Sequence, residues 1–129
     1  MSTFTPIEEY ITLADLFAEI SPITEVNSRT KVYICLVRGG EPQPVVDMWV
    51  DHATQDLVLK CTWMGMEALP MTEFASKADK CSSEYCMRLE MWDSLKGSKG
   101  VLTYASSIKY DEENDWLILR SADMKLQMV

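Results

Sequence analysis

The sequence has one histidine, few basic residues and no long apolar run, and each shortage argues against a class of function. Twelve Lys and Arg residues stand against 20 Asp and Glu, so the formal net charge is −8. Gripping a nucleic-acid backbone requires concentrated Lys and Arg, and anionic membrane surfaces attract the same residues. No stretch approaches the roughly 18 apolar residues of a membrane-spanning helix. We therefore expect neither direct nucleic-acid binding nor membrane binding.

Signals for secretion are also missing. The N-terminus has no basic segment followed by an uninterrupted apolar segment, and the chain has no N-x-S/T acceptor site. We therefore expect a cytoplasmic protein, in the host cytoplasm if the source is a virus or phage. The length of 129 residues fits a single domain over 1–129, and 47% apolar with 25% charged residues is ordinary for a globular chain.

The acidic residues concentrate at the two ends of the chain. Residues 1–28 carry five acidic residues and no basic one, and residues 111–129 carry five acidic residues and two basic ones. Ordered carboxylates can imitate phosphate charge and steer association. The acidic ends are therefore compatible with an alternative function: an acidic inhibitor or nucleic-acid mimic, of the phage anti-defence type, that blocks a nucleic-acid-binding enzyme. Acidity that only keeps the protein soluble is the plainer interpretation.

Residues 5–20, TPIEEYITLADLFAEI, carry the clearest helical pattern. Thr5 can cap the helix, Pro6 suits its first position, and Glu8 completes a capping box. Apolar side chains cover more than half of the helical circumference, whereas a helix on a sheet needs a stripe of about 100°. This excess predicts either burial on two sides or contact with a partner.

From residue 31 the apolar pattern changes to a period of two. Strands are predicted at 31–37, 45–50, 56–64, 85–92, 101–110 and 115–121, with a further edge strand possible at 124–129. A short helix is predicted near 72–80, with Thr72 as its cap. Because sequential strands usually pair, we expect an α+β fold: an N-terminal amphipathic helix packed on an antiparallel meander sheet of about six or seven strands. No internal repeat is evident.

The four cysteines and the histidine give little indication of chemistry. Zinc sites favour two paired cysteine knuckles, but Cys81 and Cys86 form one marginal pair without a second. We expect structural thiols, with a metal or a regulatory disulfide as the alternative. His52 falls in a predicted turn, and no hydrolase or metalloprotease motif accompanies it. No catalytic, metal or cofactor residue is therefore assigned, although a small enzyme that pairs His52 with Cys35 or Cys61 stays an alternative.

One segment, CTWMGMEALPM at 61–71, is unusually rich in Met and Trp for its length. Met is common on adaptable binding surfaces and Trp at interaction hot spots, although Met also fills gaps in cores. We predict a non-catalytic protein-binding or assembly module, accessory, chaperone-like or virion-type, that forms a homo-oligomer or joins a larger assembly. The predicted contact residues come from the first helix and from this segment: Tyr10, Leu13, Leu16, Phe17, Ile20, Trp63, Met64 and Met66.

In size and acidity the chain is similar to secretion chaperones, phage accessory or virion proteins and toxin-immunity proteins. This similarity rests on composition and involves no motif.

Overall fold

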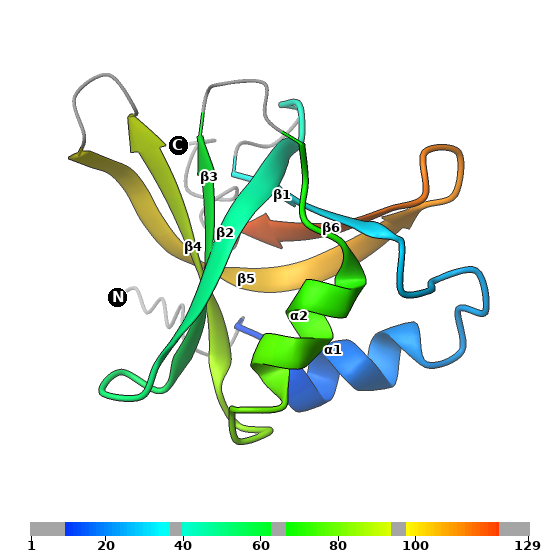
Figure 1. Cartoon of the computed structure of the whole chain (residues 1–129), viewed down its shortest axis with the longest axis horizontal. Helices are drawn as coiled ribbons and strands as arrows, with labels where there is room; N and C mark the ends of the chain where they lie inside the picture. The colour runs from blue at the N-terminus through cyan, green and yellow to red at the C-terminus, as the bar shows by residue number, and fades with distance from the viewer. Residues whose placement is uncertain (1–9, 37–39, 63–66, 94–97, 122–129) are drawn as a thin grey trace, which may run out of the picture.

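Six strands close into a β-barrel, and two short helices lie side by side at one end of it (Figure 1). The computed structural model describes residues 10–36, 40–62, 67–93 and 98–121. The elements are α1 (Leu13–Ile20), β1 (Lys31–Cys35), β2 (Gln43–Asp51), β3 (Asp56–Thr62), α2 (Met71–Ala78), β4 (Cys86–Asp93), β5 (Ser98–Asp111) and β6 (Trp116–Ser121).

The predicted antiparallel meander of six or seven strands is wrong as a description of the whole sheet. β1–β2–β3 and β4–β5–β6 are antiparallel meanders, but β3 pairs with β4 in parallel, and β6 pairs with β1 in parallel. The segment between β3 and β4 contains α2, and a connection of that length lets the chain cross over and enter the next strand in the same direction. The two parallel pairs close the sheet, and a closed barrel has no free edges.

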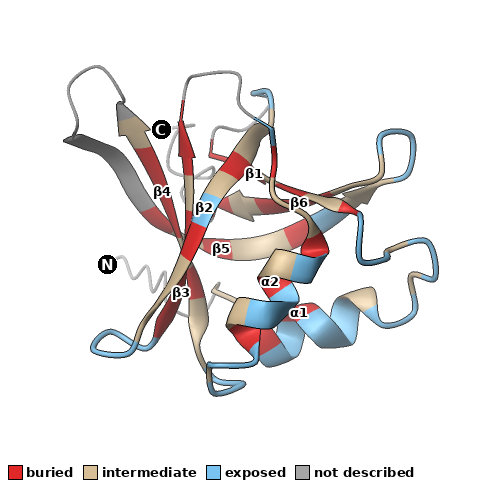
Figure 2. Cartoon of the chain, in the orientation of Figure 1, coloured by how far each residue is buried: buried red, intermediate tan, exposed pale blue. Residues whose placement is uncertain are grey.

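The barrel interior is filled by the alternating apolar residues of every strand (Figure 2). β3 and β4 show the rule, since each sends one set of side chains inward and the other set outward. The inward residues of these two strands are Leu57, Leu59, Cys61, Met87, Leu89 and Met91. Alternation of this kind is readable in the sequence, which is why the strand positions were largely predicted correctly.

The predicted helix at 5–20 is found only over its second half. Residues 1–9, including the predicted cap Thr5, lie outside the described residues, as does the possible edge strand at 124–129. α1 begins after Thr12, whose side chain accepts a hydrogen bond from the backbone of Asp15 while the Asp15 carboxylate accepts one from Thr12. This capping box satisfies two backbone donors at the start of the helix.

The short helix predicted near 72–80 is α2, but its cap is Pro70 rather than Thr72. Pro70 has no side chain that could accept a hydrogen bond. The first free backbone donors of α2 instead reach another segment, because Met71 N donates to Thr30 O at 2.7 Å and Thr72 N to Ser28 O at 3.1 Å. A helix end can be satisfied by tertiary contacts in this way, without a capping side chain.

The barrel is built from two copies of one unit, a helix followed by a three-stranded meander, which the sequence reading missed. The β2–β3 and β5–β6 hairpins match at an offset of 60 residues. Each has a register shift at the same place, between Val45 and Asp47 in one hairpin and between Ala105 and Ser107 in the other. Each turn also has a residue with positive φ at the matching position, Gln55 at 61° and Asp115 at 60°.

The contacts between the helices and the strands repeat in the same way. Leu13 N donates to Tyr85 O at 2.9 Å, and the matching bond joins Met71 N to Thr30 O. Thr12 forms an isolated bridge with the first residue of β4, and Pro70 forms one with the first residue of β1. The start of each helix is thus held by the segment that enters the first strand of the other half, so the two halves interlock. We call α1 with β1–β3 the first half and α2 with β4–β6 the second half.

Candidate functional site

The predicted contact residues of the first helix divide into core and surface. Leu13 and Leu16 belong to the core, with Leu16 fully buried, and Ile20 packs against that core. Tyr10 stacks on Tyr104 with ring centroids 5.0 Å apart. Phe17 is 37% exposed and is the one large hydrophobic side chain found exposed among the described residues.

The remaining predicted contact residues, Trp63, Met64 and Met66, lie outside the described residues. The role of the whole set in partner binding stays a prediction. Because Leu13 and Leu16 are used by the core, Phe17 is the member of α1 that offers an exposed ring.

Two grooves of similar size flank the helices, and the internal repeat relates them. One, of about 300 Å³, lies between the start of α1 and the segment after α2; its lining residues are Leu13, Ala14, Phe17, Ala78, Cys81 and Ser83. The other, of about 350 Å³, lies between the start of α2 and the segment after α1; its lining residues are Val26, Asn27, Ser28, Met71, Thr72 and Ala75. Phe17 in the first groove corresponds to Ala75 in the second, so one groove carries a ring that the other lacks.

A network of charged groups centred on Arg88 occupies the outer face of β3, β4 and β5. The Arg88 guanidinium donates to Glu90 at 3.0 Å, to Asp56 at 3.0 Å and to Asp51 at 3.2 Å. A further bond at 3.0 Å reaches the Thr54 hydroxyl. We call this set, together with Trp92 and Tyr104, the Arg88 network.

The carboxylates of the Arg88 network are unusually buried for groups on the outside of a barrel. Glu90 is 0% exposed and Asp56 is 2% exposed. Trp92 Nε1 donates to Glu90 at 2.8 Å, and the Tyr104 hydroxyl donates to Asp56 at 2.8 Å. Removing an ion from water costs several kcal/mol, so ions in such positions require partners at good hydrogen-bond geometry. The network supplies them.

The electrostatics of the network stabilise its ionised form. Burial raises the pKa of Tyr104, and the hydrogen bond to Asp56 raises it further, to about 12. Burial alone would lower the pKa of Arg88, but its hydrogen bonds to Glu90 and Asp51 raise it overall. Tyr104 therefore stays protonated and Arg88 charged across the neutral range. The arrangement ties together residues of the four strands β2 to β5 and Thr54 of the β2–β3 turn.

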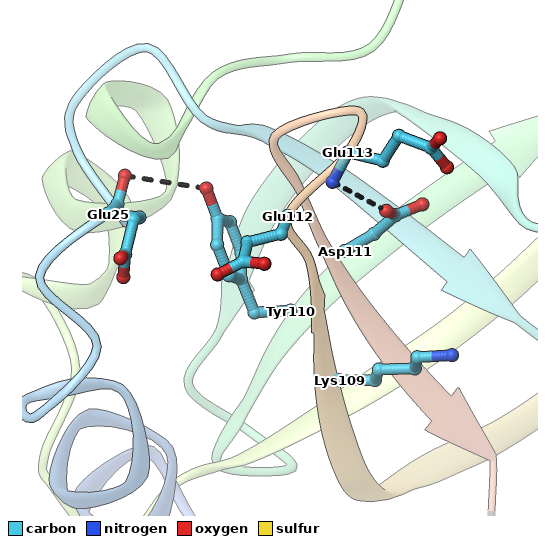
Figure 3. Close-up of a pocket in the computed structure, with 6 residues that line it drawn as sticks. All are labelled: Glu25, Lys109, Tyr110, Asp111, Glu112 and Glu113. Carbon is cyan, nitrogen blue, oxygen red and sulfur yellow. Dashed lines mark hydrogen bonds between the residues drawn. The ribbon is translucent and has the colours of Figure 1, made fainter.

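The first half's acidic segment and the second half's acidic turn meet at an open hollow, drawn in Figure 3. Its lining residues are Glu25, Lys109, Tyr110, Asp111, Glu112 and Glu113. The Tyr110 hydroxyl points toward Glu25 and lies 3.5 Å from its carbonyl oxygen, while Lys109 points the opposite way, across β6. Tyr110 also donates to the Asp115 carboxylate at 2.7 Å, the main reason that its pKa rises to about 12.

The thiols and the histidine lie in different environments. Cys81 and Cys86 are not joined by a disulfide, and burial raises the pKa of both thiols and raises that of Cys61 to about 12. Cys61 lies inside the barrel, 3.5 Å from the Met91 sulfur, whereas His52 lies on the exposed β2–β3 turn, where its Nδ1 is 2.7 Å from the Tyr85 hydroxyl. These positions separate His52 from Cys61; the small-enzyme alternative that pairs His52 with Cys35 or Cys61 stays a prediction.

Sequence reasoning did not single out the Arg88 network. Its members are separated by up to 53 residues in the chain, from Asp51 to Tyr104. One local sign was present, because Arg88 and Glu90 alternate with the apolar residues of a strand and precede Trp92. Within the described residues, no three or more His, Cys, Asp or Glu side chains form a group that could hold a metal ion, and no helix is long and apolar enough to cross a membrane.

Comparison of the chain with protein-family models, with curated proteins and with solved structures finds no match.

Proposed function

We propose that the protein is a non-catalytic assembly module that binds a second copy of its own chain through the face formed by α1 and α2. The observation that carries this proposal is the pair of corresponding grooves, of which one carries the exposed Phe17 ring and the other carries Ala75 in its place.

The two grooves are complementary in shape as a projection and a recess. The Phe17 ring packs edge-on against Phe74, with centroids 6.0 Å apart, and keeps 37% of the residue exposed. In a face-to-face dimer, Phe17 of each copy enters the groove beside Ala75 of the other copy. The dimer then contains this contact twice, related by the two-fold axis, and no further copies can add to it.

Charge also favours placing α1 of one copy against α2 of the other. The exposed side of α1 carries Asp15 and Glu19 and no basic residue, whereas the charges of α2, Glu73 in its first turn and Lys77 in its last, balance. An arrangement of α1 against α1 would oppose like charges. The electrostatic preference therefore agrees with the pairing of Phe17 and Ala75.

The energetic gain is modest for each contact but is counted twice. Fully burying a Phe side chain contributes roughly 1.5–3 kcal/mol, and a dimer contains two such rings. Association also costs translational and rotational freedom, so the surrounding grooves must add area to reach the ~1,200–2,000 Å² of a stable interface. We therefore expect association that depends strongly on Phe17.

The test is sedimentation velocity across a dilution series of wild type and two variants. Phe17→Asp places a charge at the contact, and Ala75→Trp fills the recess; both should convert the dimer to a monomer. Ala18→Asp, on the same helix and also exposed, is the matched control for charge and should weaken association less than Phe17→Asp.

Far-UV circular dichroism must be the same for the three variants and wild type, because each change lies on the surface. A wild-type protein that stays monomeric at every concentration would overturn the proposal. Dimers that persist in both Phe17→Asp and Ala75→Trp would do the same.

A second candidate function is supported by a different observation. The tertiary structure brings Glu25, from the first acidic segment, beside the acidic turn of residues 111–115. We propose as the alternative that this acidic surface blocks the nucleic-acid-binding groove of an enzyme. Such binding would weaken steeply with salt, because screening is strong beyond about 8 Å at physiological ionic strength. Glu112→Lys with Glu113→Lys should abolish it, and binding unaffected by salt or by these changes would exclude it.

A further inference from the structure

The outer face of β5, β6 and β1 carries a cavity lined with two cations. Its volume is about 290 Å³, and its lining residues are Cys35, Gly40, Pro42, Lys109, Asp111, Ile118 and Arg120. In a chain of net charge −8, a cavity with more basic than acidic lining residues is an exception to the general charge. Cations placed in one concave site can outweigh distant carboxylates, because charges beyond a Debye length of about 8 Å are largely screened.

Both cations keep donors available to the cavity. Arg120 Nε donates to the Ser107 hydroxyl at 3.1 Å, which holds the guanidinium in place, and its two terminal nitrogens make no hydrogen bond to another of the described residues. Neither Arg120 nor Lys109 takes part in an ion pair within the described residues. Lys109 lines both this cavity and the acidic hollow, and in Figure 3 its side chain extends across β6, away from Glu25 and Tyr110.

The one carboxylate of the cavity is engaged elsewhere. Asp111 Oδ1 accepts bonds from the backbone of Glu113 at 3.1 Å and of Asn114 at 3.4 Å, and Oδ2 accepts one from the Asn114 side chain at 2.9 Å. Both oxygens therefore face the β5–β6 turn. Lys109 interacts with this carboxylate through space, without direct contact in an ion pair.

The internal repeat shows what occupies the corresponding place at the other junction between the halves, where β3 pairs with β4. Cys35 of β1 pairs with Arg120 of β6, and Glu90 of β4 pairs with Lys60 of β3. In the repeat, Cys35 therefore corresponds to Glu90, and Arg120 corresponds to Lys60. Where the cavity has Cys35, the Arg88 network therefore has the carboxylate of Glu90. The β5–β6–β1 face has the short Cys35 side chain there and a cavity in front of it.

We infer that this cavity binds a small oxyanion, a phosphate or a carboxylate group, between Lys109 and Arg120. The guanidinium supplies paired donors in the fork geometry that suits an oxyanion, and the ammonium supplies a second positive charge. The site is separate from the face of α1 and α2, so the inference does not depend on self-association.

The test is an NMR titration of the amide resonances with inorganic phosphate and, separately, with sodium acetate, both at constant ionic strength. Saturable shifts should be centred on Gly40, Ile118 and Arg120. Arg120→Gln and Lys109→Gln should each weaken binding of the preferred anion by about 3- to 10-fold. Tighter binding of phosphate assigns a phosphate-bearing ligand, and tighter binding of acetate assigns a carboxylate.

The matched control is Lys60→Gln, which removes the cation at the position corresponding to Arg120 in the other half and should leave binding unchanged. Lys109→Gln keeps the test decisive if Arg120→Gln loses the fold through its bond to Ser107, because Lys109 is exposed. The inference is overturned if neither anion gives saturable shifts at the cavity. It is equally overturned if Lys60→Gln weakens binding as much as Lys109→Gln does.

Discussion

The two junctions between the halves, where β3 pairs with β4 and β6 pairs with β1, share one backbone plan but carry different side-chain chemistry on their outer faces. Arg88 in the second half corresponds to Tyr33 in the first, and Asp56 corresponds to Trp116. Where the Arg88 network joins buried ions, Tyr33 and Trp116 stack with ring centroids 3.9 Å apart and planes 22° from parallel. We call the second arrangement the Tyr33–Trp116 stack.

This difference shows that the barrel itself does not require the Arg88 network. At the junction of β6 with β1, an aromatic pair occupies the corresponding strand positions, at no cost in desolvated charge. Replacing a buried ion pair by apolar groups is often neutral or stabilising, so stability alone is weak grounds for keeping one. Four consequences of the comparison can be tested.

The largest expected effect is the loss of Arg88. Arg88→Met leaves Glu90 and Asp56 buried without their cation, and breaking a buried pair from one side costs about 3–5 kcal/mol. Tyr33→Met places the same residue, Met, at the corresponding position of β1. It removes only an aromatic pair, which contributes about 0.5–1.5 kcal/mol in addition to the burial of its surface area. Urea unfolding of both variants measures the difference. Equal losses would mean that the network contributes no more than the stack.

The two turns should respond in opposite directions to glycine. Gln55 and Asp115 both have positive φ, a region that costs a residue with a Cβ about 1 kcal/mol. Gln55→Gly should therefore raise the free energy of unfolding by about 0.5–1 kcal/mol.

Asp115→Gly relieves the same strain but removes the acceptor of bonds from Thr30 at 2.8 Å and Tyr110 at 2.7 Å. At about 0.5–1.5 kcal/mol for each bond, the net change should be destabilising by roughly 1 kcal/mol. Thermal unfolding of the two variants checks the signs. A stabilised Asp115→Gly protein would show that those two bonds contribute little.

Alkaline pH should affect the Arg88 network through Tyr104. Its pKa is about 12 in the folded protein, above the ordinary value of 10.0, so the folded state keeps this proton between those values while the unfolded state loses it. The resulting stability is present below about pH 10 and is lost as pH rises toward 12. Tyr104→Phe should flatten this loss and remove a phenolate absorbance component near pH 12. Loss of a component near pH 10 instead of near pH 12 would contradict the bond to Asp56.

The smallest expected effect is a change in the pKa of Asp51 that does not occur at Asp111, the corresponding residue of the other hairpin. Burial tends to raise the pKa of Asp51, but hydrogen bonds from Arg88 and Thr54 outweigh it and lower the value. The pKa of Asp111 is lowered by the hydrogen bond from Asn114 within its own turn. Side-chain NMR titration should show that Arg88→Met raises the pKa of Asp51 and leaves that of Asp111 unchanged. Equal movement of both would mean that the turns, not Arg88, control Asp51.

The internal repeat was hidden in the sequence because few positions need a particular side chain. Among the matched positions of the helices, the hairpins, the strands β1 and β4 and the segments that enter these two strands, the identical pairs are Ser28 with Ser83, Asp51 with Asp111, Leu57 with Leu117, and Leu59 with Leu119. The two Leu pairs point into the barrel, and the Asp pair binds the backbone of its own turn. At the other matched positions, the requirement is an apolar side chain inside and any tolerated one outside, which the two halves meet with different residues.

The sequence by itself determined the strand positions, the turns and the presence of two helices, because alternation, caps and turn residues act between neighbours in the chain. Only the tertiary structure decided the parallel pairs that close the barrel, the use of Leu13 and Leu16 in the core, and the assembly of the Arg88 network. Strand direction across a long connection, and contacts such as that between Asp51 and Arg88, depend on which distant segments bury their apolar faces together. No local pattern of side chains contains that information.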